Sequence, residues 1–438
     1  MNIRKEANNI VCRVFVKKNY SDKLLNQTVK KIKNSQRDKN LLYSLVKGTI
    51  KMYKTLEYTA LQFVDPIKFK KTPIKVKLLL YMGFYQLIYL DNLPNFAVVN
   101  ETVELARELF DERTSKFINA VLREYLRRSE IDFPDDEAEF LSYYYSFDAE
   151  MIKTWISLWG FENTEKMCEY FNSPSKYYFR INSYLNDEDE LFSYFKKKNI
   201  AFKEVENIYN FFSADKPSLL LKDIIFGDGY FSVQDPAAGL VSILLDPQKE
   251  ESLLDLFAAP GGKTTHIAEI MKNSGEIVAV DKFPHKTKLL KANARRLNLK
   301  NIMVVTGDAF NYGPVAPAFD KVLIDVPCSG WGNFQKKPEL RWQINQNMKQ
   351  LIKLQESALE KAALFVKKGG YLVYSTCTLN PLENENQVER FLKKHRNFKL
   401  VPASLFIDKK FTEKDYLKVI PFKHNFDGAF GAKLQRIK

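Results

Sequence analysis

The sequence predicts three folded parts: an all-α domain, a small α/β subdomain, and an α/β domain with a mostly parallel sheet. Residues 1–128 carry apolar residues at helical spacing, interrupted by prolines. An acidic, proline-containing stretch at 130–139 is typical of a solvated linker. From residue 253 onwards, short apolar runs alternate with amphipathic segments, as in a doubly wound sheet. We therefore expect domains at 1–130, 140–232 and 233–438.

Composition and charge favour a globular protein with a polyanionic partner. The 438 residues are 45% hydrophobic and 27% charged, and the formal net charge is +14. The first fifty residues alone hold twelve Lys and Arg against three acids. This excess favours nucleic acid over a membrane surface, although a lysine-rich surface that merely solvates helices is the alternative. The longest apolar run, 78–90, is too short to span a bilayer, and no signal peptide is recognised. We expect a monomer.

The cysteines and histidines indicate a reducing cytoplasm and no metal. The four cysteines are Cys12, Cys168, Cys328 and Cys377. They form no CxxC pair and are too sparse for a disulfide framework. None of the four histidines has metal-ligand spacing with a cysteine, so no metal site is predicted.

The first domain should be a compact bundle of short helices. Pro66, Pro73 and Pro94 separate its helical segments, and the run VKLLLYMGFYQLIYL (76–90) is apolar on nearly every face. That run should be the buried central helix. The stretches LLLYMGFYQLIYLDNLPNFAVVNETVELAR and KFINAVLREYL resemble the NusB-like RNA-binding domain over most of residues 5–128. Lys116 departs from the glycine that often stands before FxNAVLR in that family.

The middle part combines a strand at 176–185, a helix at 187–198 and further strands up to Phe231. It resembles a small RRM-like subdomain. Residues 177–180 (Tyr-Tyr-Phe-Arg) could stack on or pair with RNA, but core packing is the favoured interpretation for at least two of the rings.

The last domain is organised around residues 253–281, LLDLFAAPGGKTTHIAEIMKNSGEIVAVD. A strand ends at a Pro-Gly-Gly turn, a helix starts at Lys263, and a second strand ends in Asp281. Glycines at a helix start let backbone N–H groups approach a ligand. Asp281 stands twenty residues after Gly261, the spacing of an acid that accepts both ribose hydroxyls of a nucleoside cofactor. The pattern is not GxGxxG, which makes a dinucleotide the weaker interpretation.

Three later strand ends carry polar residues. Asp308 follows the strand at 302–305, Asp325 closes the strand that precedes Cys328, and Cys377 follows the strand at 371–374. A single acid at a strand end is often a helix cap. Three strand ends with polar residues, in register around one glycine turn, favour a ligand-binding site. Asp308 could accept from an adenine amino group.

Two cysteines on consecutive strands can both face one base, because neighbouring strands lie about 4.8 Å apart. Cys328 and Cys377 are 49 residues apart in the chain. A thiolate that adds to carbon 6 of cytosine makes carbon 5 nucleophilic enough to accept a methyl group. The proton on carbon 5 must then be removed, which requires a second group. From the residues alone, either cysteine could attack, whereas Cys12 and Cys168 are interpreted as core packing.

The blocks DLFAAPGGKT, DVPCSGWGNFQKKPELRW and GGYLVYSTCTLNPLENENQVERFL resemble the RNA cytosine-5 methyltransferases. This resemblance implies a Rossmann-type class I methyltransferase domain that uses S-adenosylmethionine. It makes Cys377 the nucleophile and Cys328 the residue that aids product release. Asp325 would hold the N3/N4 edge of the cytosine. The implied cofactor-binding residues are Phe257, Ala258, Ala259, Pro260, Gly261, Gly262, Lys263, Asp281, Asp308 and Asp325.

The order of the three parts resembles bacterial small-subunit rRNA cytosine-5 methyltransferases. The resemblance implies a target in a loop of 16S rRNA, cytosine 967 in the usual rRNA numbering. The base must leave its stack to react, and Lys336, Lys337 and Arg341 could hold the phosphates. The alternatives are methylation of tRNA or 23S rRNA, or a non-catalytic RNA-binding factor. Phe257, where the family usually has cysteine, and the ending HNFDGAFGAKL, where it has HGTDGFF, depart from the pattern.

Overall fold

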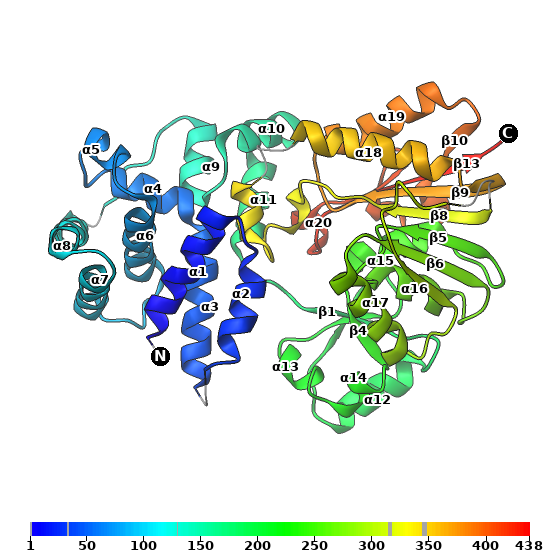
Figure 1. Ribbon diagram of the computed structural model, residues 1–438, viewed down its shortest axis with the longest axis horizontal. Coiled ribbons are helices and arrows are strands. Elements are labelled where there is room, and N and C mark those ends of the chain that lie inside the picture. The colour runs from blue at the N-terminus through cyan, green and yellow to red at the C-terminus, as the bar shows by residue number, and fades with distance from the viewer. Residues whose placement is uncertain (1, 33–34, 129, 314–317, 344–347) are drawn as a thin grey trace. The chain divides into compact units, whose positions relative to one another are not determined.

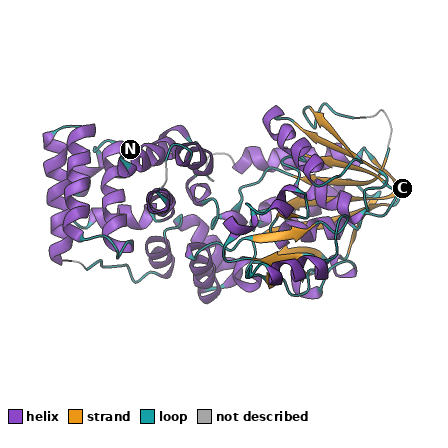
Figure 2. Cartoon of the chain, turned by 90° about the horizontal axis from the view of Figure 1, so that it is seen from below, coloured by secondary structure: helices purple, strands orange, loops and turns teal. Residues whose placement is uncertain are grey.

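The computed structural model describes residues 2–32, 35–128, 130–313, 318–343 and 348–438 (Figure 1). The chain divides into two compact units. A helical unit comprises residues 1–173 and 334–345. A second unit comprises residues 174–333 and 346–438; it contains most of the methyltransferase-like sequence blocks and is called the catalytic unit after the role expected from them. Figure 2 shows that the strands of the described residues all belong to the second of these units.

The helical unit is built around α6 (Ile74–Tyr89), which is buried on most of its faces. This confirms the predicted central helix, because an all-round apolar helix can only be stable inside a bundle. The other helices are α1 (Ile3–Lys17), α2 (Ser21–Val29), α3 (Gln36–Lys51), α4 (Tyr53–Leu61), α5 (Pro66–Lys70), α7 (Asn95–Leu109), α8 (Glu112–Arg128), α9 (Glu137–Tyr145), α10 (Ala149–Trp159) and α11 (Phe161–Asn172).

The acidic stretch 130–139 has exposed acidic side chains, as its charge predicts, but it is not a linker between two domains. The carbonyl of Asp132 accepts from the Tyr58 hydroxyl at 2.8 Å and from Gln62 Nε2 at 3.0 Å. The ring of Phe133 stacks on Tyr58 with centroids 5.8 Å apart. The helical unit therefore continues beyond the predicted boundary at residue 130, through α9, α10 and α11.

The segment 334–345 belongs to the helical unit although it follows the Pro-Cys loop in the chain. Its short 3₁₀ helix, η2 (Pro338–Trp342), buries Glu339 and Arg341. Glu339 accepts from the backbone N–H and the hydroxyl of Ser21 at the start of α2, at 3.0 and 2.9 Å. Arg341 donates to the carbonyls of Ser146 and Phe171, both at 3.1 Å. The expectation that Arg341 binds phosphate is therefore wrong, because its guanidinium is fully enclosed by protein.

A four-stranded antiparallel sheet opens the catalytic unit, in the order β2-β3-β1-β4. Its elements are β1 (Tyr178–Ile181), α12 (Glu188–Lys197), β2 (Lys203–Glu204), β3 (Phe211–Ser213), α13 (Pro217–Leu220), α14 (Ile224–Gly227) and β4 (Phe231–Val233). Tyr178 and Phe179 are buried, which confirms core packing for two rings of the 177–180 stretch. Tyr177 is half-exposed.

The second sheet has nine strands, in the order β11-β12-β13-β9-β8-β5-β6-β7, with β10 paired to β13. The central strands β7, β6, β5, β8 and β9 are parallel, and β13 is antiparallel to β9. The strands are β5 (Ser252–Leu256), β6 (Glu276–Asp281), β7 (Ile302–Thr306), β8 (Phe319–Asp325), β9 (Val366–Thr376), β10 (Phe398–Val401), β11 (Thr412–Glu413), β12 (Tyr416–Val419) and β13 (Ala429–Arg436).

Helices cover both faces of the large sheet, so successive residues of β5 and β8 are buried on opposite sides. Figure 1 shows α18 and α19 over one face and α15, α16 and α17 over the other. Leu254 and Leu256 pack with the first pair of helices, whereas Leu253 packs with α15 and α16. These helices are α15 (Pro236–Leu245), α16 (Gly262–Ile270), α17 (Pro284–Arg296), α18 (Met348–Ala363) and α19 (Glu385–Lys394); α20 (Pro421–His424) is a single turn.

Candidate active site

The glycine turn lies between β5 and α16, where the sequence predicts it. Gly261 has φ +100°, and a Cβ there would come within 2.6 Å of Leu290 Cγ on α17. Glycine is therefore required at this position for both conformation and space. The carbonyl of the next residue, Gly262, accepts a hydrogen bond from Arg180 Nη1 at 3.0 Å. Arg180 in turn forms a buried ion pair with Glu269 at 2.6 Å, which makes it a structural support and not an RNA contact.

A hollow at the ends of β5 and β8 contains most of the predicted cofactor residues. It is lined by Gln234, Ala238, Asp255, Phe257, Ala258, Ala259, Pro260, Gly262, Lys263 and Asp325. The sequence interpretation did not include Gln234, Ala238 or Asp255 among the site residues. Asp255 could have been included because it lies near the carboxyl end of the strand that precedes the glycine turn. Side chains at that end of a parallel strand face such a hollow.

Asp255 is a buried acid with unused hydrogen-bonding capacity. Its Oδ2 accepts from Thr264 Oγ1 at 2.6 Å, whereas its buried Oδ1 has no hydrogen-bond partner among the described residues. Burial raises the pKa of this carboxyl from 3.8 to about 7, and the nearby Asp325 adds to the rise. A buried polar atom without a partner, in a wall of the hollow, is suited to a ligand's donor group.

Asp281 and Asp308 stand at the ends of the next two strands, as predicted. The Asp281 carboxylate accepts from the backbone N–H groups of Ala259 at 3.1 Å and Phe283 at 3.0 Å. Its contact with Ala259 ties it to the glycine loop. A hydrogen bond from the backbone N–H of Phe310 is the largest cause that lowers the pKa of Asp308. The next is a hydrogen bond from Lys282, whose Nζ lies 3.0 Å from Oδ2 of Asp308. Neither acid lines the hollow itself.

Asp325 and Lys263 form an ion pair of 2.6 Å between Nζ and Oδ2. The other carboxylate oxygen of Asp325 accepts from Ser375 Oγ at 2.7 Å, across the register pair that joins β8 to β9. Burial by itself would lower the pKa of Lys263, but the charge and hydrogen bond of Asp325 outweigh it, and the pKa is raised. Lys263 therefore stays charged, and its charge also interacts with Cys377.

The structure brings the two predicted thiols together. Cys328 follows β8 by three residues, Cys377 follows β9 directly, and their Sγ atoms lie 3.3 Å apart. Both cysteines are partly exposed. The hydrogen bond with Cys377, then burial, raises the pKa of Cys328 well above its usual value. Cys168, by contrast, is fully buried, and Cys12 is partly buried, consistent with core packing.

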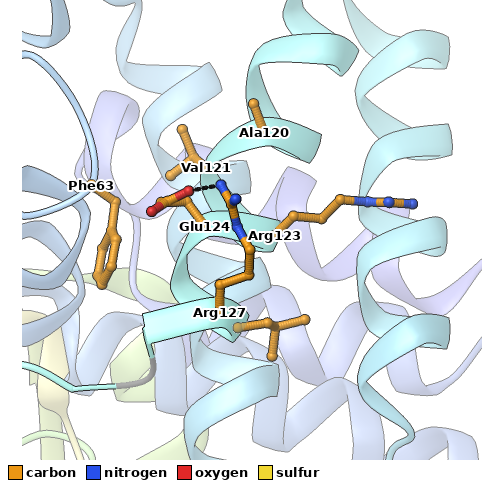
Figure 3. A pocket seen from close by; sticks show the side chains of 7 residues that line it. Phe63, Ala120, Val121, Arg123, Glu124 and Arg127 are labelled. Atoms are coloured by element: carbon orange, nitrogen blue, oxygen red, sulfur yellow. Dashed lines mark hydrogen bonds and ion pairs between the residues drawn. The ribbon is translucent and has the colours of Figure 1, made fainter.

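A larger hollow in the helical unit carries no such chemistry. It lies beside Phe63 and the last turns of α8 (Figure 3). The residues that line it are Phe63, Ala120, Val121, Arg123, Glu124, Leu126 and Arg127. They include one ion pair, Glu124 with Arg127, and no nucleophile. Size alone therefore does not identify the reactive site, and the strand ends of the catalytic unit remain the candidate.

Two searches of the described residues gave negative results. They contain no helix long and apolar enough to cross a bilayer. They also contain no group of three or more His, Cys, Asp or Glu side chains placed to hold a metal ion.

Comparisons with family models match both units. Residues 242–435 match the model described as 16S rRNA methyltransferase RsmB/F, and residues 1–127 match the NusB family. Two curated relatives are named probable ribosomal RNA small subunit methyltransferase B. The Synechocystis protein is 35% identical and the Bacillus subtilis protein 34%, each with 95% of both chains covered. The Vibrio vulnificus ribosomal RNA small subunit methyltransferase B is 30% identical over 99% of both chains.

Solved structures share the fold. The crystal structure of PH0851 superposes with a TM-score of 0.82 at 24% identity and covers 99% of both chains. The structure of NSun6 from Pyrococcus horikoshii with SFG gives a TM-score of 0.61 at 24% identity, covering 68% of this chain and 100% of that one.

Proposed function

Since the chain belongs to the 16S rRNA methyltransferase RsmB/F family, we propose that it methylates carbon 5 of a cytosine in 16S rRNA. Membership makes it an S-adenosylmethionine-dependent rRNA methyltransferase with a NusB-like domain. The position on the base and the covalent route are our proposal. The single observation that carries it is the 3.3 Å separation of two thiols beside the glycine-turn hollow.

The residues at the hollow fit S-adenosylmethionine. Asp255 offers a buried oxygen without a partner to a donor such as the amino group of the methionine part. Asp281 can accept the ribose hydroxyls, because each of its oxygens now takes only one hydrogen bond and a carboxylate oxygen can accept two. Asp308 is proposed for the adenine amino group. Bound there, the cofactor supplies an electrophilic methyl group.

Cys377 is proposed as the nucleophile. Its sulfur would add to carbon 6 of the cytosine, so that carbon 5 could take the methyl group as the bond between that methyl and the sulfonium sulfur breaks. The positive charge of Lys263 interacts with Cys377 and favours the thiolate that the addition requires. Asp325 accepts from the amino edge of the base and keeps the ring in place while it becomes electron-rich. Lys263 holds that carboxylate at 2.6 Å.

Cys328 is proposed to finish the cycle. The hydrogen bond and negative charge of Cys377 hold its pKa high in the free enzyme. Once Cys377 is bonded to carbon 6, that sulfur no longer carries a negative charge, so Cys328 loses its proton more readily. The Cys328 thiolate can then take the proton from carbon 5. The bond between sulfur and carbon 6 breaks, and the methylated base leaves.

The target base has to be extruded or single-stranded, because the reacting sulfurs lie at the end of a sheet where a duplex cannot place a stacked base. The excess of twelve basic over three acidic residues in the first fifty supports RNA binding by the NusB-like part. We further propose that the enzyme acts as a monomer in the cytoplasm; gel filtration of the purified protein tests the first of these statements.

Methylation mapping tests the proposed reaction. Purified protein, 16S rRNA and labelled S-adenosylmethionine should give 5-methylcytosine at one loop position, and bisulfite sequencing would locate it. Methylation only of tRNA or 23S rRNA would support the alternative substrates, and no methylation at all would support a non-catalytic RNA-binding factor.

Two cysteine variants test the covalent route. Cys328→Ala should accumulate an RNA–protein adduct that survives denaturing electrophoresis, because the release step is impaired. Cys377→Ala should form no adduct and lose at least roughly a thousandfold in rate, since the attacking group is absent. The reverse pattern would exchange the two roles.

A further inference from the structure

Two consecutive residues join the 3₁₀ turn η4 (Pro381–Glu383) to α19: Glu383 ends η4, and Asn384 directly precedes the helix. Glu383 is 0% exposed and Asn384 is 2% exposed. Neither has a part in the reaction steps described above. A buried acid and a buried amide are costly unless their hydrogen bonds are satisfied, so their partners indicate what these residues hold in place.

Glu383 holds both neighbours of Cys328. Its Oε2 accepts from the backbone N–H of Ser329 at 2.9 Å, and its Oε1 accepts from the Ser329 hydroxyl. Its Oε2 also accepts from Gln355 Nε2 at 2.9 Å, and the same nitrogen donates to the carbonyl of Pro327 at 3.0 Å. The residue after Cys328 is therefore bound directly to this carboxylate, and the residue before it is linked to the same carboxylate through Gln355.

Asn384 holds both neighbours of Cys377. Its Oδ1 accepts from Thr376 Oγ1 at 2.6 Å, and its Nδ2 donates to the carbonyl of Thr378 at 3.0 Å. All of these partners are buried. The arrangement repeats what Glu383 does for Cys328, with an amide in place of a carboxylate because one partner here is a donor and the other an acceptor.

The two sets of contacts are joined. Ser329 Oγ and Thr378 Oγ1 lie 2.7 Å apart, and the Ser329 hydroxyl donates to Glu383, so Thr378 is the donor to Ser329. The backbone of Glu383 is itself anchored, because its carbonyl accepts from the Tyr374 hydroxyl of β9 at 2.5 Å. The residues that follow the two cysteines are thus linked to each other as well as to the Glu383-Asn384 pair.

We propose that Glu383 and Asn384 are positioning residues that place the two thiols separately, Glu383 for Cys328 and Asn384 for Cys377. This inference rests on the proposed function, which gives the thiols different tasks. Reacting groups have to be placed to within a fraction of an ångström, so loosening one thiol should impair only the step that it serves. The two side chains should therefore give different kinetic defects.

Glu383→Gln should impair release. Glutamine replaces one carboxylate oxygen with an NH2 donor. With its oxygen at the Oε2 place, the Ser329 hydroxyl loses its acceptor; with its oxygen at the Oε1 place, the Ser329 N–H and Gln355 lose theirs. In either orientation the contact with Ser329 on one side of Cys328 is weakened. Turnover should fall by on the order of 100-fold. The covalent RNA adduct should accumulate, as in Cys328→Ala, while the KM for S-adenosylmethionine stays unchanged.

Asn384→Ala should impair the attack of Cys377 on the base. Both contacts around Cys377 are removed, so adduct formation itself should slow, on the order of 100-fold. A preparation quenched during turnover should contain less adduct than wild type, which is the opposite of Glu383→Gln. A role limited to general folding would move both variants in the same direction.

Asp320→Asn is a matched control. The Asp320 carboxylate also accepts from the backbone N–H and hydroxyl of one serine, Ser252, at 2.9 and 2.7 Å, but at the other end of β8. Its substitution should leave turnover and the adduct fraction as in wild type. The proposal is overturned if Glu383→Gln and Asn384→Ala change the adduct fraction alike, or if neither changes it.

Ser329→Ala provides a milder variant should Glu383→Gln fail to fold. It removes the hydroxyl link between Glu383 and Thr378 and leaves the backbone contact in place. It should raise the adduct fraction, and an unchanged fraction in the folded variant would contradict the proposal. Failure of the proposed function would appear elsewhere, as a wild-type enzyme that makes no 5-methylcytosine or a Cys328→Ala variant without adduct.

Discussion

Each unit encloses a cation, but to a different degree: Arg341 is buried, whereas Lys263 is partly exposed. In the helical unit, Arg341 is surrounded by backbone carbonyls and the side chain of Asn172, and it lies 3.8 Å from the centroid of the Phe147 ring. In the catalytic unit, Lys263 faces the carboxylate of Asp325. Burial lowers the pKa of Arg341 to about 9, whereas Asp325 keeps the pKa of Lys263 raised.

The difference lies in the groups that surround the two cations. The partners of Arg341 are fixed carbonyl dipoles that cannot exchange a proton, so the guanidinium serves only to join η2 to α11 and to the turn after α9. The partners of Lys263, Asp325 and Cys377, are groups that can gain or lose a proton, and Lys263 and Asp325 line a hollow that a ligand can fill. The same comparison can be tested by substitution, starting with the largest expected effect.

Asp325→Asn should have the largest effect of these tests. The amide keeps the shape but loses the charge that pairs with Lys263 and that, in the proposed function, holds the amino edge of the base. Methylation should fall by about a thousandfold, while the free energy of unfolding changes little because the pair is partly exposed. Single-turnover methylation and urea unfolding measure the two quantities. Loss of stability without loss of rate would make this pair structural, like Arg341.

Arg341→Met should have the opposite pattern of effects, with a loss of stability as the main result. Methionine fills a similar volume but leaves the carbonyls of Ser146 and Phe171 without their donor, which should cost about 3 kcal/mol of unfolding free energy. Urea denaturation followed by circular dichroism measures the loss. Lys337→Ala, an exposed change in the same segment, serves as the control. A loss below about 1 kcal/mol would show that Arg341 is not needed to hold η2.

Asp255 should make stability depend on pH. Its pKa is about 7 in the folded protein and near 3.8 otherwise, so between these values the folded state keeps a proton that the unfolded chain has lost. The stabilisation is complete at low pH and is lost as pH rises towards 7, by up to about 1.4 kcal/mol per pH unit. Asp255→Asn cannot ionise and should flatten this part of the profile. Urea midpoints across the range measure it, and an unchanged slope would contradict the assignment.

Phe257→Cys should have the smallest effect. Phe257 lines the hollow, packs edge-on against Phe310 with centroids 6.0 Å apart, and occupies the position where the family usually has cysteine. Because the exchange alters neither an acid nor a reacting thiol, the methylation rate should change by less than about threefold. Steady-state kinetics with varied S-adenosylmethionine would detect a larger change, which would give Phe257 a direct part in cofactor binding.

Most residues of the candidate site could be predicted from local sequence patterns. The Pro-Gly-Gly turn, the acids at strand ends and the spacing of Cys328 and Cys377 could be predicted because each depends on a strand ending at a known residue. Asp255 was missed because a single acid inside an apolar run gives no periodic signal. The partners of Glu383 also could not be predicted, because 54 residues separate it from Ser329 in the chain.

The amino-acid sequence was enough to predict the helical first part, the mostly parallel sheet of the last part, and the residue types that meet at the carboxyl ends of its strands. These follow from short-range periodicity and from the geometry of parallel strands. Only the tertiary structure decided that residues 334–345 belong to the helical unit, that Arg341 is enclosed, and that one dipeptide holds both cysteine loops. Such contacts join residues far apart in the chain, and which donor reaches which acceptor depends on packing in three dimensions.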